Sequence, residues 1–489
     1  MSFFLRGITQ KKFLRILGFS GFLVSAAFLN AQGHTLKARV TIAPSVPEIR
    51  IQIDSDTAAH DWSFRNAYAG VLALGERIER FEAIGEAGES LPVRKIAAGE
   101  YRSDEKVTRV SYSVKLVLPS RPGDRAHVSW LTDDYGFLMF ADILPQLFAR
   151  EATSEQGVLV EFETPVGWQV RSAIVPNEKN QYLVLDPDSA VFFVARLLRT
   201  SSRMVEFMEV EVMSSGVWPF ADAEVLKVAA KVVRKYFEIT GFRLKGKSVV
   251  MLAPLPPSQG NSFWRAETRG STVVLLLDPR ARRANWAGQL GVIFTHEIFH
   301  LWVPNSLHLQ GDYDWFFEGF TLYEALLMAL DLKLITFQEY LDTISRVYDS
   351  YLSYSDPLSL IEASEQRWTS SAPLVYDKGM LVAFMYDLIT RQESGGKSTL
   401  ADRYRALFKS HADDRANANE VIAGLLNSSV ATKGFSKSYV ESRSVVELER
   451  FLPAYGIQID SNGPRTHLSV RKGITKNQQQ LLRSLGYKD

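Results

Sequence analysis

The sequence predicts an α+β fold, in which an all-β, sandwich-like part precedes a small sheet followed by many helices. Between about residues 36 and 211, short segments alternate or run apolar, and turn residues such as those of Pro119–Asp124 separate them. After Gly216 the apolar residues recur at helical spacing, first between Ala221 and Thr240. Sheets followed by a run of helices are typical of the α+β class.

The individual elements follow from the same patterns. The first part is expected to contain strands at Ala38–Ile42, Val107–Leu118, Gly157–Glu163 and Gln181–Leu185. The second part is expected to contain two strands, Lys247–Leu252 and Thr272–Leu277. Helical periodicity then covers residues 287–302, 318–332, 337–352, 376–391 and 398–410, and more weakly 413–458. Beyond Asp460 the polar composition predicts a poorly packed tail.

Composition excludes several functional classes. The chain carries 56 Lys and Arg residues against 55 Asp and Glu residues. This balance argues against a partner held by overall charge, so we expect no nucleic acid partner. The chain has no cysteine, which excludes disulfides, a thiol nucleophile and cysteine metal sites. Any zinc must therefore be held by histidines and carboxylates.

The N-terminus predicts export. Four basic residues precede the apolar run Ile16–Leu29, and small residues follow it. This order is typical of a cleaved signal peptide, here residues 1–31, and it favours a periplasmic or secreted protein. A single membrane anchor is the alternative, but the run is short and is interrupted by Gly18 and Gly21. We expect no stable membrane insertion after cleavage, because no later segment reaches about 18 consecutive apolar residues.

A metal-binding motif lies in the first long helical segment of the second part. The sequence His296-Glu297-Ile-Phe-His300 places two imidazoles four residues apart, on one face of a helix. Both rings can therefore reach one zinc ion. Glu297 lies beside the first ligand and can take a proton from the water that attacks a carbonyl. The alternative is a buried helix with two satisfied histidines.

Glu318 is the candidate third ligand. It lies eighteen residues after His300 and directly follows three aromatic residues. Burying an unpaired carboxylate there is costly, and a metal ion compensates its charge. Two histidines and one glutamate with an open fourth position form a catalytic rather than a structural zinc set. The sequence therefore predicts one Zn²⁺ ion held by His296, His300 and Glu318.

These residues resemble the motifs of the gluzincin metallopeptidases. Within that group the chain resembles the M61 family, the glycyl aminopeptidases, with the aminopeptidase N family as more distant relatives. The resemblance covers about residues 290–457. Its matching stretches are residues 296–302, 315–323, 376–382, 387–391 and 394–400, and more loosely 435–441 and 455–457.

The resemblance implies roles for further residues. It makes Tyr376 the tyrosine that stabilises the transition state. It also makes Glu324 a candidate support for a zinc ligand, although a plain surface glutamate is the favoured alternative. It also implies that Glu267, on an edge strand, binds the free amine of the substrate. The alternative for Glu267 is a surface glutamate that pairs with Arg265 or Arg269. Arg265 stands where the family has a glycine, so the amine pocket is crowded or redirected.

The resemblance also implies a layout of domains. Residues 32–212 would form the N-terminal β domain and residues 213–460 a thermolysin-like zinc peptidase domain. Residues 461–489 would form a C-terminal tail that is too short for the family's usual PDZ domain.

The expected activity is zinc-dependent hydrolysis of peptide bonds, most simply the removal of N-terminal residues from a peptide or protein substrate. Two alternatives remain: a zinc endopeptidase with an open cleft, and a non-catalytic peptide-binding protein on a peptidase scaffold.

Overall fold

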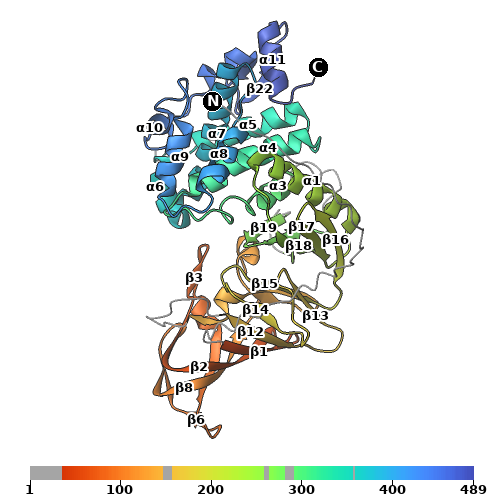
Figure 1. Cartoon of the computed structure of the whole chain (residues 1–489), viewed down its shortest axis with the longest axis vertical. Coiled ribbons are helices and arrows are strands. Elements are labelled where there is room, and N and C mark those ends of the chain that lie inside the picture. Colours follow the sequence, from red (N-terminus) through yellow and green to blue (C-terminus); the bar gives the residue numbers. More distant parts are fainter. Residues whose placement is uncertain (1–35, 147–156, 258–263, 281–290, 356–357, 489) are drawn as a thin grey trace, which may run out of the picture. The chain divides into compact units, whose positions relative to one another are not determined.

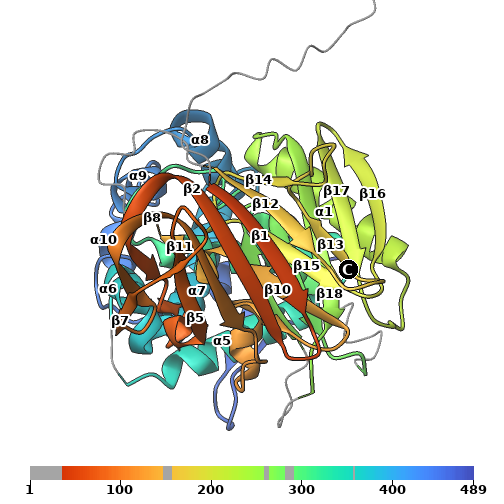
Figure 2. The same ribbon diagram turned by 90° about the horizontal axis from the view of Figure 1, so that it is seen from below.

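Alternating burial of side chains builds the first large sheet of the protein. In β1 (Leu36–Ala43) every second residue is buried, because successive side chains of a strand point to opposite faces. The sheet has nine strands among the described residues, and its main path runs β14-β12-β1-β2-β8-β5-β6. Its longest strands, β2 (Glu48–Phe64) and β8 (Glu100–Lys115), pair antiparallel (Figure 2). The others are β5 (Ile78–Ile84), β6 (Ser90–Leu91), β7 (Val93–Ala97), β11 (Pro145–Gln146), β12 (Val158–Glu163) and β14 (Tyr182–Val184).

A computed structural model describes residues 36–146, 157–257, 264–280, 291–355 and 358–488 of the chain. The expected signal peptide, residues 1–31, lies outside the described residues. Within these ranges, every helix is too short or too polar to cross a bilayer.

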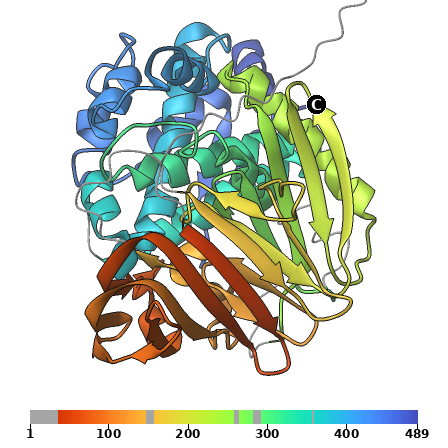
Figure 3. The ribbon, with the colours of Figure 1, turned by 60° about the horizontal axis from the view of Figure 1, so that its bottom comes forward.

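Strand β10 (Tyr135–Met139) shows how the sheets are layered. Its Leu138 joins a core shared with the nine-stranded sheet, whereas its Phe137 and Met139 join a second core on the opposite face. That second core also contains Met251 and Val274 from a third sheet. The four-stranded sheet β13-β15-β10-β9 therefore packs on another sheet at each face (Figure 3). Its other strands are β9 (Trp130–Leu131), β13 (Gln169–Ser172) and β15 (Val191–Ala195).

The third sheet leads from the β-rich part to the helices. Its strand order is β16-β17-β18-β20-β19. The predicted strands at 247–252 and 272–277 correspond to β18 (Gly246–Pro254) and β20 (Thr272–Leu277). Periodicity alone did not reveal the edge strand β19 (Trp264–Arg269), because three of its six residues are charged. The remaining strands are β16 (Arg199–Val205) and β17 (Met208–Ser214).

Helices cover the other face of the third sheet. Apolar residues of α1 (Asp222–Thr240) share one large core with β18, β20 and the helices that follow. The predicted mixture of sheets and helices is confirmed (Figure 1), and α5 has the predicted bounds. The further helices are α3 (Gly291–Phe299), α4 (Thr321–Asp331), α5 (Phe337–Leu352), α6 (Leu360–Glu365), α7 (Ala372–Ser394), α8 (Ala401–His411), α9 (Ala418–Leu426) and α10 (Phe435–Tyr439).

The prediction of a poorly packed tail beyond Asp460 was wrong. Strand β22 (His467–Val470) pairs antiparallel with β21 (Ile457–Asp460). A capping box at Thr475 then begins α11 (Lys476–Ser484), and such a box stabilises a helix start. The few apolar residues of this segment gather on one face and are buried: Leu481, Leu482 and Leu485.

Two glycines allow a close crossing between α7 and the π-helical segment η5 (Trp315–Phe320). A Cβ added to Gly319 would lie 2.5 Å from the Cα of Gly379. A Cβ added to Gly379 would lie 2.8 Å from the carbonyl oxygen of Trp315. Because backbone atoms cannot yield as a flexible side chain can, only glycine fits at either position. The crossing brings Glu318 of η5 close to Tyr376 of α7.

This crossing predicts an asymmetry between two glycine substitutions. We expect Gly379→Ala to lower the free energy of unfolding by about 1–3 kcal/mol, because the added methyl group overpacks the crossing. Gly424→Ala is the matched control: it lies in α9, where an added Cβ meets no atom within 4 Å. The control should gain about 0.4–1 kcal/mol, since alanine is the better helix former. Thermal and denaturant unfolding measure both changes, and an equal effect of the two would contradict the close crossing.

Candidate metal centre

Helix α3 presents His296, Glu297 and His300 on one face. The apolar residues Phe294, Ile298 and Phe299 anchor the helix in the core, so its polar residues face away from them. His300 follows the last residue of α3, and its backbone N–H still donates to the carbonyl of His296. All three site side chains are buried. The helix therefore holds two imidazoles and one carboxylate in a fixed arrangement.

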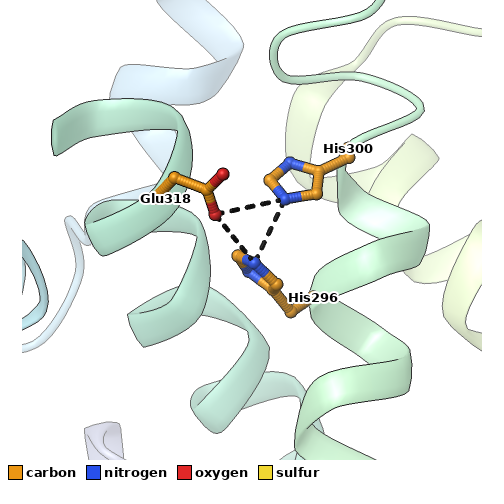
Figure 4. A group of neighbouring side chains, drawn as sticks. All are labelled: His296, His300 and Glu318. Atoms are coloured by element: carbon orange, nitrogen blue, oxygen red, sulfur yellow. Dashed lines mark hydrogen bonds and ion pairs between the residues drawn. The ribbon is translucent and has the colours of Figure 1, made fainter. Parts of the chain in front are cut away.

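The side chains of His296, His300 and Glu318 converge on one point (Figure 4). The two Nε2 atoms lie 3.1 Å apart, and Oε2 of Glu318 lies 3.2 Å from Nε2 of His296 and 3.5 Å from Nε2 of His300. Tetrahedral zinc with bonds of about 2.0–2.1 Å spaces its ligand atoms by about 3.3–3.4 Å. The three predicted ligands therefore fit zinc in both chemistry and spacing.

Two further contacts fix the imidazole rings. Nδ1 of His300 donates to the carbonyl oxygen of Val303 at 2.8 Å. Nδ1 of His296 lies 3.3 Å from Oγ1 of Thr321, whose hydroxyl donates to the carbonyl oxygen of Phe317. These contacts orient both rings with Nδ1 toward an oxygen atom and Nε2 toward the point shared with Glu318.

Glu324 does not support a zinc ligand in the way the resemblance implied; Thr321 and the Val303 carbonyl contact the two rings instead. The carboxyl group of Glu324 is buried near Asp387. Its burial and the charge of Asp387 raise its pKa to about 8. Thr321 could have been found from the sequence, because it lies one helical turn after Glu318.

Arg367 is a largely covered cation at the candidate metal centre, with 10% of its side chain exposed, and the sequence did not reveal it. Its Nη2 donates to Oε1 of Glu318 at 2.7 Å, and its Nη1 donates to Oδ1 of Asp314 at 2.6 Å. Burial alone would raise the pKa of Glu318, but the charges of Arg367 and His300 hold it well below its usual range. Glu318 is therefore ionised, as a metal ligand must be.

Glu297 and Tyr376 lie on the wall of the same cavity as the three ligands. This cavity has a volume of about 700 Å³. Oε2 of Glu297 accepts a hydrogen bond of 2.7 Å from the hydroxyl of Thr268 on β19. The phenol oxygen of Tyr376 accepts a hydrogen bond of 2.8 Å from Nη2 of Arg367. The structure thus places a base and a hydroxyl donor beside the candidate metal centre.

Glu267 also lines this cavity, and it is already paired within the protein. Its Oε1 accepts hydrogen bonds from Nε of Arg269 at 2.7 Å and from the hydroxyl of Tyr68 at 2.8 Å. Its Oε2 contacts Nδ1 of His127. Burial opposes ionisation, but the charges of Arg269 and His127 lower the pKa of Glu267 to about 2. Of the alternative for Glu267, the pairing with Arg269 is present, and the side chain is 12% exposed.

Comparison with known proteins shows a shared fold. No family model and no curated protein matches the chain by sequence. An aminopeptidase N family protein from Idiomarina loihiensis matches with a TM-score of 0.75 at 16% identity, over 88% of this chain and 81% of that one. An M1 zinc metallopeptidase from Deinococcus radiodurans matches with a TM-score of 0.54 at 12% identity, over 85% of this chain and 95% of that one. A mutant of the latter, solved with a Tyr-Ser-Ala substrate, has the same TM-score at 13% identity. The chain therefore has a fold that zinc metallopeptidases also have.

The protonation of His300 predicts how metal binding depends on pH. In the metal-free protein, burial disfavours the charged ring, but the carboxylate of Glu318 outweighs this and raises the pKa of His300 to about 9. Below that pH a zinc ion must displace one proton from His300. We therefore expect the zinc affinity to rise about tenfold per pH unit up to about pH 9 and then to level off.

Competition with a chelator at several pH values measures this affinity, and calorimetry in buffers of different ionisation enthalpy measures the released proton. Arg346→Met is the control, because Arg346 lies at an exposed position of α5 away from the three ligands, and the variant should keep the same pH dependence. A zinc affinity that is flat from pH 6.5 to 9 would contradict the assigned protonation state of His300.

Proposed function

We propose that the protein is a zinc metallopeptidase. One observation carries the proposal: the His296, His300 and Glu318 ligand triangle shares a cavity with Glu297 and Tyr376. A zinc ion held there would supply Lewis-acid chemistry, polarising a carbonyl and making water a stronger nucleophile. The shared fold with zinc metallopeptidases supports the proposal.

The residues around the triangle match the needs of peptide hydrolysis. Glu297 would accept the proton of the attacking water, and the hydroxyl of Thr268 would hold its carboxylate in place. Tyr376 would donate a hydrogen bond to the oxyanion that develops on the substrate carbonyl. Glu297 would then return its proton to the leaving amine. The reaction needs no covalent intermediate with the protein.

We infer that the enzyme removes N-terminal residues. Glu267 would accept a hydrogen bond from the α-ammonium group of the substrate, because its carboxylate is ionised and lines the cavity. Each carboxylate oxygen accepts up to two hydrogen bonds, so Oε2, which contacts only His127 among the described residues, has capacity left. Oε1 is filled by Arg269 and Tyr68.

The finer assignments are part of the same proposal. We propose that the chain is an exported member of the M61 family, with residues 1–31 as its signal peptide and a periplasmic or secreted destination. Residues 32–212 would form its N-terminal β domain and residues 213–460 its thermolysin-like catalytic domain. The motifs at 296–302, 315–323 and 376–382 support this assignment.

A specific observation favours the endopeptidase alternative. The charge of Glu267 is offset by Arg269, whose side chain is almost fully buried. An amine anchor whose charge is offset attracts an ammonium group less strongly than a free carboxylate does. An enzyme in which Glu267 does not bind the amine would accept internal segments of a peptide and cleave them with the same zinc chemistry.

A further prediction concerns the hydrolysis of peptide bonds. We expect zinc-loaded protein to cleave a mixed peptide library with loss of single N-terminal residues. Glu297→Gln should lower the rate by at least about 100-fold, because it removes the general base. Mass spectrometry of the products gives both the cleavage position and the side-chain preference. Internal cleavage would support the endopeptidase, and binding without turnover at full zinc occupancy would support the non-catalytic alternative.

Another prediction concerns Glu267 as the anchor of the substrate amine. We expect the double variant Glu267→Gln, Arg269→Gln to raise KM about 10- to 150-fold for peptides with a free N-terminus, the value of one charge-assisted hydrogen bond. Changing both residues avoids leaving the buried Arg269 unpaired. The same peptides with an acetylated N-terminus are the control, and their cleavage should be slow and unaffected by the variant. An equal change for both sets of peptides would contradict the amine-binding role.

A further inference from the structure

One guanidinium nitrogen joins the candidate metal ligand to the candidate transition-state donor. Nη2 of Arg367 lies 2.7 Å from Oε1 of Glu318 and 2.8 Å from the phenol oxygen of Tyr376. This nitrogen carries two hydrogens, so it donates to both oxygens at once. Glu318 and Tyr376 lie in different segments, η5 and α7. Arg367 therefore connects two segments through the site.

The surroundings of Arg367 fix its orientation. Its Nη1 donates to Asp314 at 2.6 Å, and its guanidinium carbon lies 4.4 Å from the ring centre of Trp368. The rings of Phe317 and Tyr376 lie within 5.7 Å and 5.5 Å of the same carbon. Only 10% of the side chain is exposed. A planar cation held by an ion pair and by aromatic faces has little freedom to rotate.

The contact with Glu318 determines which carboxylate oxygen faces the metal. Oε1 accepts the hydrogen bond from Arg367, whereas Oε2 lies close to both imidazole nitrogens. A carboxylate without this contact can rotate or present both oxygens to a metal. Arg367 thus restricts Glu318 to one ligating oxygen and leaves space at the centre for water and substrate.

The contact with Tyr376 determines where its proton points. A phenol oxygen has one hydrogen to donate, and here its acceptor side is occupied by Nη2 of Arg367. The hydroxyl hydrogen must therefore point away from the guanidinium. Tyr376 lines the cavity and also shares a side-chain hydrogen bond with Glu318, so this hydrogen can be donated to Glu318 or to a group on the substrate. Positioning of this kind is needed before a donor can stabilise a transition state.

We propose that Arg367 is a positioning residue whose Nη2 atom fixes Glu318 and Tyr376 relative to each other. Metal binding and oxyanion stabilisation therefore depend on the same side chain. The kinetic part of this inference rests on the proposed peptidase function. The metal-binding part does not, because zinc affinity can be measured without any substrate.

The experiment compares Arg367→Met and Arg367→Lys with the unchanged protein. Both variants should lose zinc affinity about 10- to 100-fold, the usual effect of removing a partner of a metal ligand. At saturating zinc, both variants should also lower kcat about 10- to 100-fold, with little change in KM. Lysine retains the charge and lowers the risk of misfolding, but one ammonium group does not reproduce the fork that reaches three oxygens. Arg346→Met, at an exposed position of α5, is the control and should change neither quantity.

The tyrosine contact is tested by a double-mutant cycle. In a Tyr376→Phe background, Arg367→Met should lower kcat by a much smaller factor than in the unchanged protein, while its effect on zinc affinity persists. Full zinc affinity and full kcat in Arg367→Lys would overturn the proposal, because charge alone would then suffice. If Arg367→Met lowered kcat by the same factor in the Tyr376→Phe background as in the unchanged protein, the proposed contact with the tyrosine would be overturned. Absence of activity in the unchanged zinc-loaded protein would refute the proposed function, yet the zinc affinities would still decide the role of Arg367.

Discussion

The burial of one carboxylate, that of Glu318, constrains the whole centre. This side chain follows three aromatic residues and is almost fully buried. A buried charge without partners is strongly destabilising. Here two imidazoles approach one of its oxygens, and Arg367 pairs with the other. The segments that carry these partners must therefore converge on Glu318, and the glycine crossing between η5 and α7 permits that approach.

The candidate metal ligands could be predicted from the sequence because their relation is local. Two histidines four residues apart share a helix face whatever the tertiary structure is, and a glutamate after three aromatic residues calls for a compensating charge. Their neighbours could not be predicted in the same way. Val303 contributes only a backbone carbonyl, which any residue has, and Arg367 lies 49 residues beyond Glu318. Contacts of that kind depend on how α6 and α7 pack, which no short motif encodes.

The same distinction applies to the fold. Helices with a regular apolar period, such as α1 and α5, and the mostly apolar strands β18 and β20 could be recognised from their pattern. Strand β19 could not, because charged residues occupy every second position of an edge strand beside the cavity. The packing of α11 could not be predicted from the sequence for another reason. Its two buried leucines, and Leu485 directly after it, are sparse within a polar segment, and the pattern alone does not show that they join the core.

The pairing of Glu267 gives the β-rich part a place in the site. Arg269 lies on the same strand, but Tyr68 ends the short strand β3 (Ala67–Tyr68) and His127 lies in a turn between β8 and β9, both in the β-rich part of the chain. Arg269 also stacks on the ring of Tyr68, with its guanidinium carbon 4.1 Å from the ring centre. The carboxylate that would meet the substrate is therefore held partly by residues from outside the helical part. Since a buried carboxylate takes its charge state from all its partners, residues of the β-rich part contribute to the electrostatics of the cavity together with the helices that carry the candidate metal ligands.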